Sequence, residues 1–235
     1  MTHSIHFISL GPGDPELITR KGERLLREAE IIFYPATQTS EGLTSRALEI
    51  LRALEIDNGK TRPFFLPMRK ERTAAWQAYD KLCEKVRQAY TADKKVAIVA
   101  EGDAGFYASI QYAFDKLRTE GFPVVRVAGI PAFIAAGSLA GLHIASQEER
   151  LQVFPGNASF AELKQGIETG DSLVIMKLSA CRDALREAIQ KLSRQARFHY
   201  FENVSTMSER YLSDPEKILK QTFPYFSLMI IQPNS

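Results

Sequence analysis

The sequence predicts an α/β protein, because short apolar runs alternate with longer amphipathic segments from one end of the chain to the other. Three of the apolar runs stop at a glycine turn that leads directly into a helical pattern, at residues 11–16, 101–103 and 129–132. A strand that ends in a glycine turn before a helix is the usual place for an α/β sheet to hold a ligand. Each turn alone is also compatible with a simple strand–helix connection, so the prediction rests on their conjunction.

The first half of the chain is expected to form four strands, each followed by a helix. The expected strands cover residues 6–10, 31–34, 62–67 and 95–100. The expected helices cover residues 18–29, 46–54, 73–90 and 106–114. Residues 37–45 are polar and are expected to form a loop.

The second half follows a break at Gly121-Phe122-Pro123, where a charged helix end meets residues that interrupt regular structure. A strand at 124–127 and a helix of small residues at 135–140 come next, and then strands interleaved with helices. These later strands are expected at residues 151–155, 171–178, 197–203 and 225–231. We therefore expect two α/β domains, residues 1–116 and 117–235.

The opening turn, Gly11-Pro12-Gly13-Asp14-Pro15-Glu16, is unsuited to phosphate. A phosphate cradle needs successive backbone N–H donors and often a lysine. Pro12 and Pro15 have no N–H, and the carboxylates of Asp14 and Glu16 would repel an anion. A neutral or positively charged ligand, such as a sulfonium cofactor, fits these residues better.

The composition excludes several classes of partner. Lys and Arg number 30 against 28 Asp and Glu, and a net charge of +2 gives no support for binding nucleic acid or a membrane surface. The start of the chain has no basic segment before an apolar core, and no apolar run approaches the roughly 18–20 residues of a membrane helix. We expect a cytoplasmic protein in which Cys83 and Cys181 are buried thiols rather than a disulfide.

Motifs for other chemistries are missing from the sequence. His3, His6, His143 and His199 have no metal-ligand spacing with one another or with the cysteines, so no metal site is predicted. The sequence contains neither a G-x-S-x-G elbow nor a G-x-x-x-x-G-K-[ST] phosphate loop.

Several stretches of the chain closely resemble the tetrapyrrole methylase family, the class III S-adenosylmethionine-dependent methyltransferases. They are ISLGPGDPELITRKGERLLREAEIIFY, AEGDAGFYAS, AGIPAFIAAGSLAGL, and VIMKL followed by YFENVSTMSERY. The likeness covers nearly the whole chain in the right order. It implies two α/β domains with S-adenosylmethionine in the cleft between them, and usually a homodimer.

Within the family, the details are most similar to the branch that methylates C-20 of precorrin-2 or cobalt-factor II in cobalamin biosynthesis. Supporting features are Tyr34-Pro35, the PATQTSEGLTSRALEI segment, FFLPMRKER upstream of Trp76, and YFSLMII near the end. Uroporphyrinogen III methyltransferases usually carry Tyr-Asp and Gly-Gly-Asp where this chain has Tyr34-Pro35 and Glu101-Gly102-Asp103. The chain departs from its own branch at Ala104, where the GDP-type motif has proline.

The resemblance also implies which residues form the site. The cofactor is expected to contact Pro12, Gly102, Asp103, Phe106, Pro131, Ala132, Met176, Asn203, Val204 and Ser205. Glycine and proline let backbone carbonyls approach it closely, Asp103 balances its positive charge, and Phe106 or Tyr107 supplies an apolar wall. The carboxylates of a tetrapyrrole substrate are expected to bind basic side chains, with Arg46, Arg69, Lys70, Arg72 and Lys177 as the hypothesised set. The candidates for the base that accepts the departing proton are Tyr107, Glu101 and His143.

Three other functions stay open. The chain could methylate another corrin position or another tetrapyrrole, it could belong to the family branch that methylates ribosomal RNA, or it could bind the cofactor without catalysis. The small net charge gives little support to RNA, and no motif is visibly broken, which counts against a binding module. Metal-free and cobalt-bound tetrapyrroles are both compatible with the sequence.

Overall fold

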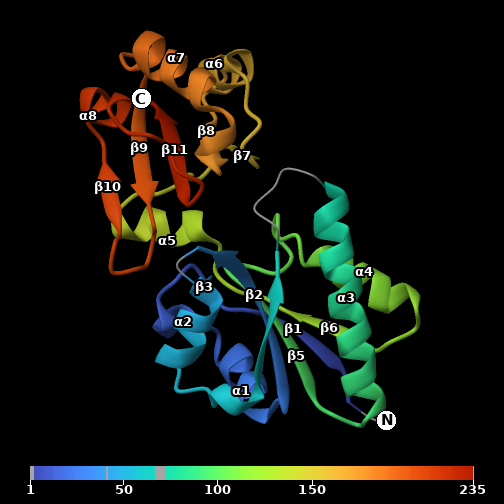
Figure 1. The fold of residues 1–235 in the computed structure, drawn as a ribbon. Coiled ribbons are helices and arrows are strands. Elements are labelled where there is room, and N and C mark those ends of the chain that lie inside the picture. The colour runs from blue at the N-terminus through green and yellow to red at the C-terminus, as the bar shows by residue number, and fades with distance from the viewer. Residues whose placement is uncertain (1–2, 41, 67–71, 235) are drawn as a thin grey trace. The chain divides into compact units, whose positions relative to one another are not determined.

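The computed structural model describes residues 3–40, 42–66 and 72–234, with the backbone alone for residues 72–74, and it confirms the α/β class. The chain divides into two compact units, Met1–Pro131 and Ala132–Ser235, each with its own sheet (Figure 1). The N-terminal unit extends beyond the boundary expected after residue 116, because β6 (Val124–Val127) pairs with β1 (Ile5–Ser9). The Gly-Phe-Pro break therefore lies between the helix α4 (Gln111–Thr119) and β6 within one unit, not between two domains.

Among the described residues, the N-terminal sheet has six strands in the order β3-β2-β5-β1-β6, with β4 pairing with β2. The remaining strands are β2 (Ile31–Thr39), β3 (Gly42–Thr44), β4 (Thr61–Phe65) and β5 (Val96–Ala100). All pairings are parallel except that of β3 with β2. This antiparallel hairpin occupies most of the segment 37–45, which was wrongly expected to be a loop: Thr37 to Thr39 pair with Thr44 to Gly42.

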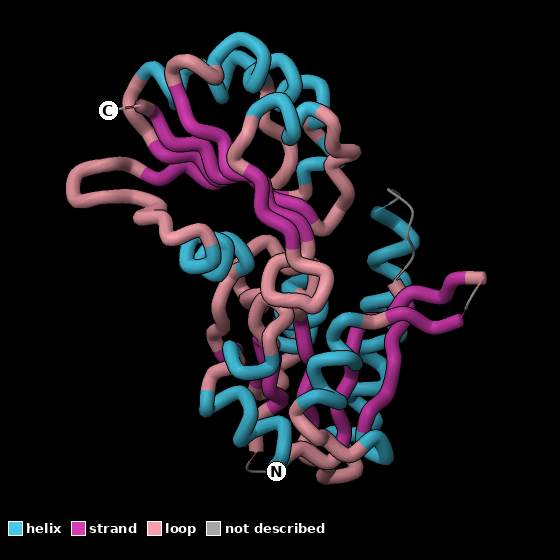
Figure 2. Tube along the Cα trace, turned by 90° about the vertical axis from the view of Figure 1, so that its left-hand side faces the viewer, coloured by secondary structure: helices cyan, strands magenta, loops and turns pink. Residues whose placement is uncertain are grey.

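Helices cover both faces of this sheet (Figures 1 and 2). They are α1 (Arg20–Glu28), α2 (Arg46–Ala53), α3 (Arg72–Thr91) and α4 (Gln111–Thr119), with short 3₁₀ helices η1 (Pro15–Leu17) and η2 (Asn58–Lys60). Successive side chains of a strand point to opposite faces. Ile8 and Val99 accordingly pack in the core beneath α1 and α2, whereas Phe7 and Ile98 pack in the core beneath α3 and α4.

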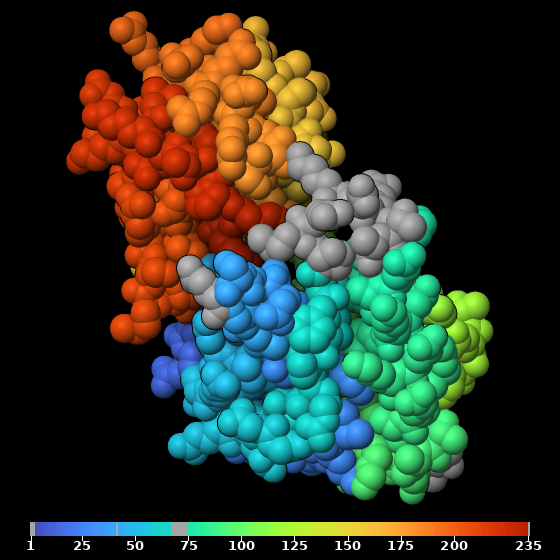
Figure 3. All heavy atoms as spheres, in the orientation of Figure 1, coloured from blue at the N-terminus to red at the C-terminus, as the bar shows by residue number. Residues whose placement is uncertain are grey.

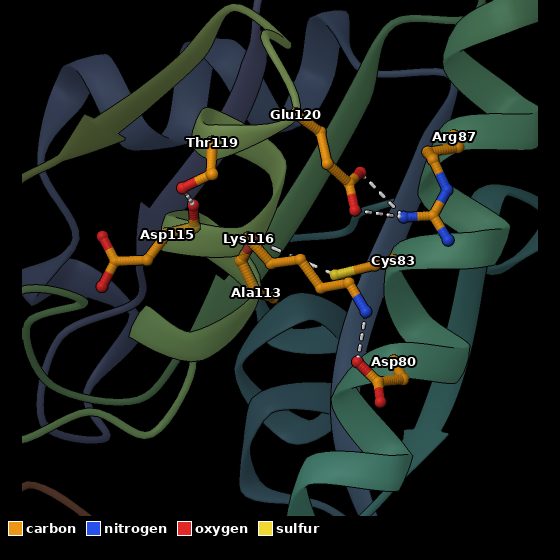
Figure 4. Close-up of polar contacts among 8 residues, drawn as sticks. All are labelled: Asp80, Cys83, Arg87, Ala113, Asp115, Lys116, Thr119 and Glu120. Carbon is orange, nitrogen blue, oxygen red and sulfur yellow. Dashed lines mark hydrogen bonds and ion pairs between the residues drawn. The ribbon is translucent and has the colours of Figure 1, made fainter.

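Polar contacts between α3 and α4 hold one of these helical layers together (Figure 4). Arg87 donates to Glu120 at 2.8 Å, and Lys116 pairs with Asp80. Between the two ion pairs lies the Cys83 thiol, which is fully buried and unpaired with Cys181, as expected. The outer side of α3 forms part of the molecular surface (Figure 3).

The C-terminal unit is built on a mixed sheet in the order β10-β9-β11-β8-β7. Its strands are β7 (Leu151–Phe154), β8 (Ser172–Met176), β9 (Ala196–Glu202), β10 (Arg210–Leu212) and β11 (Ser227–Pro233). Its helices are α5 (Ala132–Leu139), α6 (Phe160–Glu168), α7 (Arg182–Leu192) and α8 (Pro215–Leu219), with the 3₁₀ helix η3 (Leu178–Ala180). Strand β8 runs parallel to β7, and β11 runs antiparallel to both β8 and β9. Apolar residues of α6, α7 and α8 share one core with this sheet.

Candidate functional site

The three predicted glycine turns meet at one edge of the N-terminal sheet. Strand β1 lies between β5 and β6, and the three strands are parallel, so their carboxyl ends share an edge. Beyond that edge, Gly11 N–H donates to the Gly102 carbonyl at 3.1 Å and Gly102 N–H donates to the Gly11 carbonyl at 2.7 Å. Gly129 comes so close that a Cβ on it would lie 2.8 Å from the Gly102 oxygen. The turns thus form one junction, joined mainly by backbone.

Ser9, the last residue of β1, connects the residues on either side of this junction through its hydroxyl group. Its side chain is 0% exposed, and its hydroxyl donates to the Val127 carbonyl at 2.6 Å. The same oxygen accepts the Ala104 N–H at 2.8 Å. Ser9 therefore links β1 to both neighbouring strand ends. The sequence analysis missed this residue, although a small polar residue at the end of an apolar run was a visible signal.

Asp103 joins the second turn to the third. One carboxylate oxygen accepts the Gly129 N–H at 2.7 Å, and the other accepts the Gly105 N–H at 2.8 Å. Hydrogen bonds to an ionised acceptor are each worth about 1.5–3 kcal/mol. A carboxylate has about four lone-pair positions, so these two bonds leave capacity for a ligand. These contacts show that Asp103 holds the second and third turns together. Its contact with a cofactor remains a prediction.

The junction leaves open space beside Gly102. This residue has a φ of +67°, and a Cβ built on it would meet nothing within 4 Å. The carboxylates of Glu101 and Asp103 stand on either side of it in sequence. Asp14 of the first turn accepts the Glu16 N–H at 2.8 Å and thereby caps η1. The Asp103 carboxylate is part of this junction, which favours a neutral or positively charged group over an anion.

Glu101 is held next to the start of α2. The Ala47 N–H donates to its carboxyl group, and the Arg46 guanidinium lies close enough to interact with it. Burial raises the pKa of Glu101, and the charge of Arg46 opposes that rise. Burial likewise lowers the pKa of Arg46, with Glu101 opposing that change. The charges of these two half-buried side chains therefore partly neutralise each other.

Phe106 and Tyr107 lie in the loop before α4, not in a helix as the apolar spacing suggested. The Phe106 N–H bonds to the Asp103 carbonyl at 3.2 Å, and Tyr107 has a φ of +50°. The tight turn tied by Asp103 therefore delays the helix until Gln111. The two rings meet edge to face at 4.6 Å, and Tyr107 is 43% exposed.

A second group of predicted residues gathers at one edge of the C-terminal sheet. Strands β8 and β9 flank β11 and run in the same direction, so Met176 at the end of β8 and Asn203 directly after β9 lie at the same edge, on either side of β11. Asn203 and Ser205 have φ values of +49° and +62°, and Val204 between them is buried. Backbone held in such sparsely populated conformations is often found at functional sites.

Lys177 stands at the same edge, directly after β8. Its φ is +56°, and burial lowers the pKa of its ammonium group. Its Nζ lies 6.0 Å from the centre of the Tyr225 ring, a cation–π contact. A strained, half-buried lysine is costly to keep in the folded protein, which makes Lys177 a stronger candidate for ligand binding than a surface lysine.

The other predicted residues are distributed as follows. Arg69 and Lys70 lie outside the described residues, and Arg72 is described by its backbone only, at the start of α3. Pro131 ends the N-terminal unit and Ala132 begins α5. Pro12 lies in the first turn and is half-buried. His143 is exposed in the loop after α5, where its carbonyl accepts the Gln232 amide at 2.7 Å.

In the part of the chain that the structure describes, no three side chains of His, Cys, Asp or Glu gather in a way that could hold a metal ion. No helix in the same residues combines the length and apolar character that crossing a membrane requires.

Comparison with known proteins identifies the family. The family model for Tetrapyrrole (Corrin/Porphyrin) Methylases matches residues 4–219. The chain belongs to the tetrapyrrole methylase family. It is 28% identical over 232 residues to a precorrin-2 C(20)-methyltransferase of Sinorhizobium sp, covering 95% of this chain and 93% of that protein. It is 26% identical over 178 residues to a cobalt-precorrin-2 C(20)-methyltransferase of Salmonella typhimurium, covering 76% and 74% of the two chains.

Other members of the tetrapyrrole methylase family extend this comparison. The chain spans 45% of the cobalamin biosynthesis protein CobIJ of Mycobacterium tuberculosis, with 28% identity. A uroporphyrin-III C-methyl transferase of Thermus thermophilus, solved with S-adenosyl homocysteine, superposes with a TM-score of 0.68 at 20% identity. That match covers 98% of this chain and 97% of the other, so the two proteins share their fold throughout.

Proposed function

We propose that this tetrapyrrole methylase transfers a methyl group from S-adenosylmethionine to C-20 of precorrin-2 or cobalt-factor II in cobalamin biosynthesis. The observation that carries the proposal is the junction of the three glycine turns, with open space beside Gly102. The relative from Sinorhizobium sp, which is named for this reaction, matches nearly the full length of both chains and supports this substrate. A relative named for cobalt-precorrin-2 also matches, at 26% identity over 178 residues, so the experiment below includes a cobalt-bound substrate.

The residues at the junction fit S-adenosylmethionine. The amino acid portion of the cofactor carries a positive charge, which the carboxylate of Asp103 would balance, and the space beside Gly102 is open. Phe106 or Tyr107 would supply an apolar wall. We propose that Pro12, Gly102, Asp103, Phe106, Pro131, Ala132, Met176, Asn203, Val204 and Ser205 hold the cofactor.

The reaction depends mainly on how the protein positions the two reactants. When bound, S-adenosylmethionine supplies an electrophilic methyl group, and the acceptor carbon of the tetrapyrrole is electron-rich. The protein therefore gains most by holding the two reactants in line and away from water. The Gly11–Gly102 bridge and the bonds of Ser9 and Asp103 provide a rigid base for this purpose.

Basic side chains would bind the carboxylates of the substrate. Arg46 and Lys177 are both half-buried, and charge-assisted hydrogen bonds strengthen where water is excluded. Arg69, Lys70 and Arg72 complete the proposed set. We expect the affinity for the tetrapyrrole to fall steeply as salt rises, and binding that is independent of salt would contradict this part of the proposal.

Mass spectrometry tests the reaction. Anaerobic incubation with S-adenosylmethionine should add one methyl group to precorrin-2, and NMR should place it at C-20. A parallel incubation with cobalt-factor II decides which substrate is preferred. Cofactor binding without transfer to either one would contradict the proposal and favour another corrin position.

A matched pair of variants tests the location of the cofactor. Gly102 and Gly121 both have positive φ and open space around a Cβ, so leucine should strain the backbone similarly at either position. We expect Gly102→Leu to weaken the binding of labelled S-adenosylmethionine at least tenfold in equilibrium dialysis, and Gly121→Leu to leave it unchanged. Equal affinities in the two variants would contradict the proposed site.

A homodimer in the cytoplasm is part of the same proposal, supported by the family resemblance. Light scattering coupled to size-exclusion chromatography separates a 26.4 kDa monomer from a dimer. A monomer at micromolar concentration would contradict the proposed assembly.

A further inference from the structure

The proposed reaction leaves one chemical requirement unassigned. When C-20 forms its new bond to the methyl group, the bond between that methyl group and sulfur breaks and its electron pair stays on sulfur. The hydrogen on C-20 must then leave as a proton, and the electrons of its bond return to the ring system. A group of the protein that accepts this proton would complete the reaction, and general bases contribute about 10²–10⁴-fold to such steps.

Glu101 stands where the site residues converge. It directly follows β5 and directly precedes Gly102, whose N–H and carbonyl both bond to Gly11. Glu101 is therefore joined directly to the residue beside which the space is open. Of the other two candidate bases, His143 is exposed in the loop after α5 and Tyr107 is exposed in the loop before α4, whereas Glu101 is partly buried.

The carboxyl group of Glu101 is oriented by α2. It accepts the Ala47 N–H, one of the first backbone donors of the helix. Ser45 positions that helix start, because its hydroxyl accepts the Leu48 N–H at 3.1 Å and donates to the Pro35 carbonyl at 2.6 Å. A carboxylate with one backbone donor retains lone pairs that can take up a proton.

The surroundings of Glu101 also tune its proton affinity. Burial raises the pKa of Glu101, and the negative charge of Glu49 raises it further, while Arg46 and the Ala47 N–H lower it. Both charged neighbours that act on Glu101 belong to α2. A carboxylate with a raised pKa is a stronger base than an exposed one, because its proton affinity lies closer to the working pH.

We propose that Glu101 is the catalytic base that accepts the proton from C-20 after methyl transfer. The inference rests on the proposed function. The carboxylate takes the proton, becomes a neutral carboxylic acid, and releases the proton to water once the product leaves. Arg46 keeps Glu101 ionised before the reaction, and the loss of charge on Glu101 then frees the guanidinium to interact more strongly with substrate carboxylates.

The test compares Glu101→Gln with Glu49→Gln. The first variant keeps the size of the side chain and removes the base, so we expect kcat for precorrin-2 to fall about 100-fold with little change in KM. The ascending limb of kcat against pH should disappear with it. Glu49 is exposed, and its removal should leave kcat at the plateau unchanged while shifting that limb to lower pH. Glu101→Asp, which retains a carboxylate, should recover part of the activity if Glu101→Gln alters folding.

A second measurement does not depend on turnover. In protein labelled with ¹³C at the glutamate carboxyl carbons, the signal that Glu101→Gln removes should titrate above the ordinary pKa of 4.5. A value at or below 4.5 would overturn the inference. So would a Glu101→Gln variant with wild-type kcat, or one in which KM alone rises, since that pattern belongs to a residue that only orients Arg46. Absence of product from the wild-type protein would instead contradict the proposed function.

Discussion

Replacement of Ser9 by alanine removes the side chain that joins β1 to both neighbouring strand ends. The change leaves the Ala104 N–H and the Val127 carbonyl without their bonds of 2.8 and 2.6 Å, at a position that is 0% exposed. A buried polar group that loses its partner costs about 1–3 kcal/mol. With two such groups, and relaxation at one of them, we expect the free energy of unfolding of the N-terminal unit to fall by about 3 kcal/mol.

Urea denaturation measures this loss. Trp76 is the only tryptophan of the chain and belongs to the N-terminal unit, so its fluorescence reports the unfolding of that unit. A loss of about 3 kcal/mol should lower the urea midpoint by about 1–2 M, given a typical dependence on denaturant.

Thr119→Ala is the control for this experiment. Its hydroxyl also donates to a backbone carbonyl, that of Asp115 at 2.8 Å, but on the exposed side of α4 (Figure 4). We expect this variant to change stability by less than about 0.5 kcal/mol. If Ser9→Ala costs no more than the control, the hydroxyl of Ser9 does not hold the turns together.

Three further predictions follow from single contacts. Gly129→Ala should lower both the melting temperature and the affinity for S-adenosylmethionine, because the new Cβ would stand 2.3 Å from Cβ of Ser9. Overpacking of this kind costs about 1–3 kcal/mol, and an unchanged melting curve would contradict the prediction. Burial raises the pKa of the Cys83 thiol from 9.0 to about 11, so the unfolded chain loses this proton at lower pH than the folded protein does. The free energy of unfolding should therefore decline between pH 9 and 11, and urea titrations should find a smaller decline in Cys83→Ala. Lys177→Gly should relieve the backbone strain of a φ of +56° and stabilise the C-terminal unit by about 0.5–1 kcal/mol in thermal denaturation. The KM for the tetrapyrrole should rise in the same variant. A destabilised variant would show that contacts of the lysine side chain offset the strain.

The glycine turns were predictable from the sequence, because both the turns and the strands before them are local patterns. That they would meet followed from the rule that parallel strands end at a common edge. The helix 73–90 was predicted closely, since α3 is long and its apolar spacing is regular.

Features that depend on distant partners escaped the sequence analysis. Ser9 bonds to residues 95 and 118 positions away, so its polar side chain at the end of an apolar run could draw attention, but its partners could not be identified from the sequence. The hairpin of β2 and β3 pairs Thr37 to Thr39 with Gly42 to Thr44, and this mainly polar segment lacks the apolar alternation that marks a strand. The expected domain boundary failed for the same reason, because only the pairing of β6 with β1 assigns residues 124–127 to the first sheet.

The bond between Ser9 and Ala104 also limits which residue can stand at position 104. The Ser9 hydroxyl accepts the Ala104 N–H at 2.8 Å, and proline has no N–H to donate. A proline at this position would remove that bond and leave the bond to the Val127 carbonyl, so the Ser9 side chain would still tie β1 to β6 but would hold the turn that follows β5 less firmly.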